Sequence, residues 1–170
     1  GADVGKYEQE RGDKDAQEHY ARTGEAAMQK IYRSRKVSVA AIDGYCIGGA
    51  LELAAACHIR IVEPSTYFGL PEGTRGLFLG GGGSVRVPRL IGVSRVTDMM
   101  LTGRVYEAEE AYAIGLAQYK VDAGLGMAKA MQLAQRVAGN APMSNFAIMQ
   151  SLPRIADQSM QEGMLTESLM

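Results

Sequence analysis

Hydrophobic positions along the chain form short unbroken runs that alternate with helical spacings, and this pattern predicts alternating strands and helices. Val37–Ile42 is a β-branched apolar run that predicts a buried strand, and an apolar helix is expected directly after it over Gly49–Cys57. His58–Val62 predicts a second strand, followed by a short extended piece around Tyr67 and Phe68. Strands separated by helices indicate parallel pairing, so the pattern favours the α/β class.

The remainder of the chain is predicted to be mainly helical. Tyr20, Ala27, Met28 and Ile31 recur at helical spacing within residues 16–35, ahead of the first strand. Beyond Gly80, helices are expected over residues 83–90, 94–101, 108–114 and 127–138. Pro142 should open a further helix, and Pro153 should interrupt or end it.

The turn between the first strand and its helix carries the pattern most suggestive of chemistry. Gly48 and Gly49 lack a Cβ and allow close approach to the backbone, while the start of a helix presents free N–H groups and partial positive charge. Glu52 lies in the first helical turn, although acids favour that position in any helix. A second acid, Glu72, follows Pro71 in a turn. Together they indicate acid–base chemistry beside a polarised carbonyl.

An ordered set of motifs resembles the crotonase (enoyl-CoA hydratase/isomerase) superfamily. The set comprises 44–52, 68–72, 80–83, 101–103, 108–111 and 115–116, and residues 1–3 resemble a Gly-Ala-Asp motif that normally lies well inside the chain. The resemblance spans nearly all 170 residues. It implies a crotonase-like spiral of ββα turns with a helical C-terminal region. Residues 1–122 would hold the later turns with the active site, and residues 123–170 an incomplete trimerisation region.

The resemblance also implies a role for individual residues. It makes Glu52 and Glu72 catalytic, the backbone N–H groups of Ala2 and Gly49 the oxyanion hole, and Gly48, Leu70 and Gly80 substrate-binding. The implied reaction is hydration of a 2-enoyl-CoA to a 3-hydroxyacyl-CoA without metal or redox cofactor, with coenzyme A as part of the substrate. A Δ3,Δ2-enoyl-CoA isomerase or an acyl-CoA hydrolase of the same superfamily stays open. A non-catalytic binding subunit or an RNA-binding relative is disfavoured by the two acids and the near-neutral charge.

Composition and charge give no support for nucleic-acid binding, a membrane span, or a metal or redox site built on cysteine. The net charge of −1 gives no reason to expect nucleic acid, and no apolar run is long enough to cross a membrane. Cys46 and Cys57 have no metal-like or redox spacing and are expected to pack, as is His58, while Arg75 should be solvated. The compartment predicted is the cytoplasm, with the mitochondrial matrix as the alternative. By resemblance, the assembly is a homotrimer or a dimer of trimers.

Because its first residues match an internal motif, the chain is expected to be part of a longer polypeptide. Buried parallel strands need neighbours on both sides. The 170 residues alone should therefore expose sheet edges and fold poorly.

Overall fold

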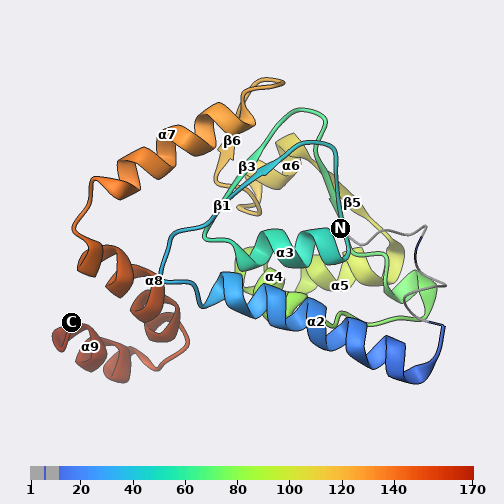
Figure 1. The fold of residues 1–170 in the computed structure, drawn as a ribbon, viewed down its shortest axis with the longest axis horizontal. Coiled ribbons are helices and arrows are strands. Elements are labelled where there is room, and N and C mark those ends of the chain that lie inside the picture. Colours follow the sequence, from blue (N-terminus) through green and yellow to red (C-terminus); the bar gives the residue numbers. More distant parts are fainter. Residues whose placement is uncertain (1–5, 7–11) are drawn as a thin grey trace.

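A computed structural model describes residue 6 and residues 12–170 of the chain as two small sheets surrounded by helices (Figure 1). One sheet has the order β1-β3-β6 and the other the order β2-β4-β5. The strands are β1 (Val39–Ile42), β2 (Tyr45–Ile47), β3 (Ile59–Val62), β4 (Tyr67–Gly69), β5 (Val105–Glu107) and β6 (Tyr119–Lys120). The two strands predicted from apolar runs are confirmed as β1 and β3, and the extended piece as β4.

Parallel pairing, as predicted, joins the early strands. β1 pairs with β3 from Val39 opposite Ile59, and β2 pairs with β4 from Tyr45 opposite Tyr67. β3 also pairs with β6 in parallel, whereas β4 and β5 are antiparallel. Strand β2 was missed because only three residues separate Gly44 from Gly48, too few for a periodicity to show.

The predicted helices all form, with boundaries shifted by a few residues. They are α2 (Lys14–Tyr32), α3 (Gly49–Ala56), α4 (Gly83–Ile91), α5 (Val93–Thr102), α6 (Ala108–Ala113), α7 (Gly126–Ala138) and α8 (Pro142–Ala156). A 3₁₀ turn η2 (Gly73–Arg75) and helix α9 (Met160–Ser168) were not predicted. The expectation that Pro153 interrupts or ends its helix is wrong, because α8 continues past it to Ala156.

The main core lies where α3, α4 and α5 pack on the second sheet. Leu51, Phe68, Val87 and Met99 are fully buried in one cluster, to which Tyr106 also belongs. A smaller cluster around Ile61, Ala130 and Leu133 fixes α7 on the first sheet. Since α3 contacts both α2 and α4, the acid that it carries is held between these two helices.

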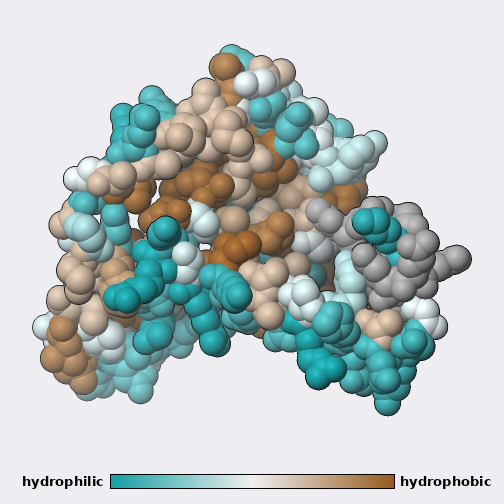
Figure 2. All heavy atoms as spheres, in the orientation of Figure 1, coloured by the Kyte–Doolittle hydropathy of each residue, from teal (hydrophilic) through white to brown (hydrophobic). Residues whose placement is uncertain are grey.

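In each sheet, the strand that comes first in the sequence is an edge strand in the described part of the chain. β1 and β2 are each edge strands among the described residues, and Tyr45 on β2 is 77% exposed. Hydrophobic residues gather over β1 and α3 in Figure 2, where a hollow of about 490 Å³ is lined by these elements and by Met127 and Ala130 of α7.

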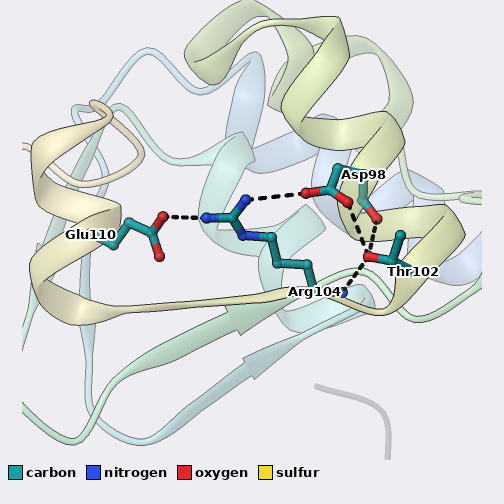
Figure 3. A network of polar contacts seen from close by, with 4 residues as sticks. All are labelled: Asp98, Thr102, Arg104 and Glu110. Atoms are coloured by element: carbon teal, nitrogen blue, oxygen red, sulfur yellow. Dashed lines mark hydrogen bonds and ion pairs between the residues drawn. The ribbon is translucent and has the colours of Figure 1, made fainter.

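A network of hydrogen bonds and ion pairs on the surface links α5 to α6 at the corner between these helices. Arg104, just ahead of β5, lies between Asp98 of α5 and Glu110 of α6, while its backbone N–H donates to the Thr102 hydroxyl (Figure 3). The guanidinium also lies 4.6 Å from the centre of the Tyr106 ring. These contacts are partly exposed, so they stabilise the corner only modestly.

Helices α7, α8 and α9 form an arm at one side of the molecule (Figure 1). α8 packs mainly against α9, which starts with a capping box between Ser159 and Glu162. Large hydrophobic side chains on this arm remain exposed, among them Met127, Met131, Met143, Ile148, Leu152, Met164 and Leu165. In the part of the chain that the structure describes, no helix has the length and apolar character that a bilayer span requires.

Candidate active site

The glycine turn between β2 and α3 brings the backbone close to a carboxylate. Gly48 has φ +55° and ψ −120°, a conformation that side-chain-bearing residues rarely adopt, and its N–H donates to the Gly69 carbonyl at 2.9 Å. A Cβ at Gly48 would lie 2.6 Å from Oε1 of Glu72. Both the backbone conformation and the nearby carboxylate therefore require glycine here.

Gly49 is the first residue of α3, where a backbone N–H has no partner within the helix. A Cβ built on it would meet no atom of the described residues within 4 Å. The second predicted oxyanion donor, Ala2, lies outside the described residues. The paired oxyanion hole therefore stays a prediction.

Glu52 is held by the glycine loop that precedes α4. It is only 6% exposed, and its Oε1 accepts hydrogen bonds from the N–H groups of Gly81 at 2.8 Å and Gly83 at 3.0 Å. Oε2 makes no hydrogen bond with the described residues. Glycine is needed at position 83 because a Cβ there would lie 2.7 Å from Cγ of Glu52.

Glu72 approaches the same turn from the end of β4 and directly precedes η2. Burial raises the pKa of its carboxyl, and the negative charge of Glu52 raises it further, while a backbone hydrogen bond and Arg75 act in the opposite direction. Its Oε2 is buried with no hydrogen-bond partner among the described residues. This is the environment of a carboxyl that holds a proton more tightly than usual.

The remaining predicted substrate residues occupy different environments. Gly80 is exposed in the loop that leads to α4, next to the amides that hold Glu52. Leu70 is fully buried in the main core, where its side chain packs. The structure thus brings together Gly48, Gly49, Glu52 and Glu72.

One residue of this site was missed from the sequence. Arg86 of α4 is buried, and its guanidinium donates to the Gly81 carbonyl, within the loop that binds Glu52. Nothing in the local pattern distinguishes it from Arg89 on the same helix, which is exposed. Only the folded loop reveals the difference.

The cysteines and histidine outside the turn behave as packing residues. Cys46 is buried, and burial raises the pKa of its thiol to about 12. His58 Nδ1 accepts from the Ser38 N–H at 3.1 Å, and burial lowers the pKa of its ring. Among the residues that the structure describes, no three metal-binding side chains cluster together.

A glycine turn with a helix-start amide that has no partner within its helix, and two carboxyls beside it, suits acid–base chemistry on a polarised carbonyl. The model of the enoyl-CoA hydratase/isomerase family matches residues 1–170. The chain belongs to this family.

Solved structures agree with this assignment. A Rhodopseudomonas palustris protein assigned as an enoyl-CoA hydratase is 52% identical, with a TM-score of 0.87 over 92% of this chain and 61% of that one. DspI of Pseudomonas aeruginosa is 35% identical, with a TM-score of 0.86 over 93% and 64% of the two chains. An enoyl-CoA hydratase from Bacillus anthracis is 30% identical, with a TM-score of 0.92 over 99% and 65%. The predicted crotonase-like α/β fold is confirmed, and the chain spans less than two thirds of the length of these relatives.

Proposed function

We propose that the whole protein adds water to the double bond of a 2-enoyl-CoA thioester and releases a 3-hydroxyacyl-CoA. The observation that carries this proposal is the unequal environment of the two carboxyls. Glu52 is buried and receives two backbone N–H bonds on one oxygen, and Glu72 is half-buried with a raised pKa. Two carboxyls in such different environments suit opposite roles in proton transfer.

In this mechanism the free oxygen of Glu52 accepts a proton from water as the water oxygen bonds to C3. The electron pair of the double bond moves toward the thioester carbonyl, whose oxygen receives a hydrogen bond from the Gly49 N–H. Glu72 then supplies a proton to C2, which restores the carbonyl. One oxyanion donor of this kind typically contributes about 2.7–4 kcal/mol to transition-state stabilisation.

A Δ3,Δ2-enoyl-CoA isomerase is the second candidate. It needs one carboxyl to move a proton, and Glu72 alone could serve because the Glu52 carboxylate is already bound to the glycine loop. An acyl-CoA hydrolase would release free coenzyme A. We favour hydration because the Glu52 carboxylate is held through Oε1, while its Oε2 has no hydrogen bond to the described residues and could accept a proton from water.

The experiment is product analysis with the whole protein in H₂¹⁸O, using short, long and aromatic 2-enoyl-CoA and 3-enoyl-CoA esters. Hydration places ¹⁸O on C3 of the product, isomerisation places none, and hydrolysis places it on the released acid. Label on C3 supports the proposal. A product without label, formed by moving the double bond, contradicts it and supports the isomerase.

We also propose that the whole protein is an oligomer, either a homotrimer or a dimer of trimers. The hydrophobic side chains exposed on α7–α9 are consistent with a trimer or a dimer of trimers formed through this arm. Light scattering on the whole protein would test it, and a monomer would contradict it. We also propose the cytoplasm as the compartment, with the mitochondrial matrix as the alternative.

A further inference from the structure

Arg86 is a buried cation with an incomplete set of partners. Its side chain is 8% exposed, and one guanidinium nitrogen donates to the Gly81 carbonyl, while Nε is buried without a hydrogen-bond partner among the described residues. Tyr32 of α2 places its ring 5.4 Å from the Arg86 Cζ. A buried polar group left unpaired is unfavourable, so this arrangement calls for an explanation beyond stability.

The geometry of the loop supplies that explanation. Gly81 donates its N–H to Glu52 and offers its carbonyl to the Arg86 guanidinium. The peptide group between Gly82 and Gly83 is held differently: its N–H donates to Glu52, while its carbonyl accepts the ordinary helical hydrogen bond from the backbone N–H of Arg86 at 3.1 Å, which does not involve the arginine side chain. The side chains of Glu52 and Arg86 therefore bind opposite polar groups of the same residue, Gly81, and the guanidinium is the contact that a substitution at position 86 would remove.

Glycine allows this arrangement at the central position. Gly82 has φ +87°, and a Cβ there would lie 2.7 Å from the guanidinium nitrogens, so the guanidinium lies directly against the backbone. Lysine has no planar fork and could not cover the loop in the same way.

We propose that Arg86 is a positioning residue, which fixes the Gly81–Gly83 loop and thereby the orientation of the Glu52 carboxylate. This inference rests on the proposed function for its catalytic consequence. Among the described residues, the titratable groups that act on Arg86 are Tyr32 from α2 and Glu52 from α3, and Glu52 in turn interacts with Glu72. Arg86 touches no reacting atom in this account and acts only through the loop.

The test compares Arg86→Met and Arg86→Lys with Arg89→Met in the whole protein. Arg89 lies on the same helix but is exposed and pairs with Asp157, which makes it a matched control. We expect Arg86→Met to lower kcat by about 10- to 10²-fold with little change in KM, because a misplaced catalytic group costs rate rather than binding. Arg86→Lys should have a kcat between those of Arg86→Met and the wild type. Because Arg86→Met removes a positive charge near the carboxylates, the acid limb of its kcat–pH profile should move to higher pH. Arg89→Met should match the wild type.

A second readout does not depend on turnover. Hydrogen exchange of the Gly81 and Gly83 amides should be faster in Arg86→Met and Arg86→Lys than in Arg89→Met. If Arg86→Met does not fold, the test rests on Arg86→Lys. An Arg86→Lys protein with the kcat, the pH profile and the amide exchange rates of the wild type would overturn the inference. If the wild type turns over no enoyl-CoA ester, the proposed function fails, while the exchange rates still decide whether Arg86 holds the loop.

Discussion

Two buried glutamates hold the starts of two helices in the described part of this molecule, and among the described residues one of them, Glu52, lies near a further, half-buried carboxyl, that of Glu72. Glu52 binds the amides of Gly81 and Gly83 where α4 begins, and Glu63, which is 8% exposed, binds those of Gly124 and Gly126 where α7 begins. Both satisfy N–H groups that have no partner within the helix, and both place negative charge at its positive end.

The difference lies in how the oxygens are used. Glu63 binds one amide with each oxygen, Oε2 to Gly124 at 2.6 Å and Oε1 to Gly126 at 2.8 Å, so both oxygens accept a hydrogen bond. Glu52 binds both amides through Oε1. The comparison teaches that burial and hydrogen bonds to a helix start do not by themselves distinguish the glutamate that we propose as catalytic. A free oxygen and a neighbouring acid set Glu52 apart.

The largest effect after Glu52 itself should come from Glu72. Glu72→Gln removes the group that we expect to supply the proton to C2, so hydration should fall by at least about 10²-fold. Binding of a saturated acyl-CoA, which needs no proton transfer, should be retained. Steady-state kinetics and calorimetry check both, and a variant with wild-type turnover would remove Glu72 from the mechanism.

The two helix starts can be disturbed in a matched way. Gly83 and Gly126 have no positive φ, and the atoms nearest to an added methyl group belong to the glutamate side chain, at 2.7 Å from Glu52 Cγ and 2.6 Å from Glu63 Oε1. Gly83→Ala and Gly126→Ala should each destabilise the protein by about 1–3 kcal/mol, as overpacking does. Only Gly83→Ala should also lower kcat, by about 10-fold or more, because it moves Glu52. Equal kcat values in the two variants would contradict the distinction.

Glu72 should also affect how stability depends on pH. Its pKa is raised above the ordinary value of 4.5, so the folded state binds this proton more tightly than the unfolded state. The resulting stabilisation is present at low pH and is lost as pH rises from about 4.5 through the raised pKa. The free energy of unfolding of the wild type relative to Glu72→Gln should therefore decrease over this window. Denaturant titrations at several pH values check it, and a difference that grows with pH would contradict it.

The smallest effect should come from the surface network of Figure 3. Arg104→Gln removes two exposed ion pairs, with Asp98 and Glu110. We expect unchanged turnover and a small fall in Tm that shrinks as salt is added, because exposed charges are screened. A marked loss of activity would mean that this corner is coupled to the site.

The sequence predicted the elements whose signal is local. The apolar run before Gly44 predicted β1, and the apolar residues after Gly49 predicted α3, because both periods are visible within a few residues. Gly48 could be singled out because a strand, a glycine pair and an acid follow one another. Pro153 misled the prediction, since an interior proline usually ends a helix, and α8 tolerates it.

The rest depended on contacts between distant parts of the chain. Glu63 and the amide of Gly126 are 63 positions apart, and Glu52 and that of Gly83 are 31 apart, so no local pattern shows that these groups meet. The unequal environments of Glu52 and Glu72 could not be predicted for the same reason, because burial is a property of the fold. Arg86 was missed because its partner is a backbone carbonyl, which carries no sequence identity.

The most direct test compares Glu52→Gln with Glu63→Gln in the whole protein, with kcat for 2-enoyl-CoA hydration and the free energy of unfolding measured on both. Each variant weakens hydrogen bonds to a buried charged group, so each should lose roughly 1.5–3 kcal/mol of stability. Glu52→Gln should lower kcat by at least about 10²-fold, whereas Glu63→Gln should keep it near the wild-type value. Full hydratase activity in Glu52→Gln, or an equal loss in both variants, would contradict the account.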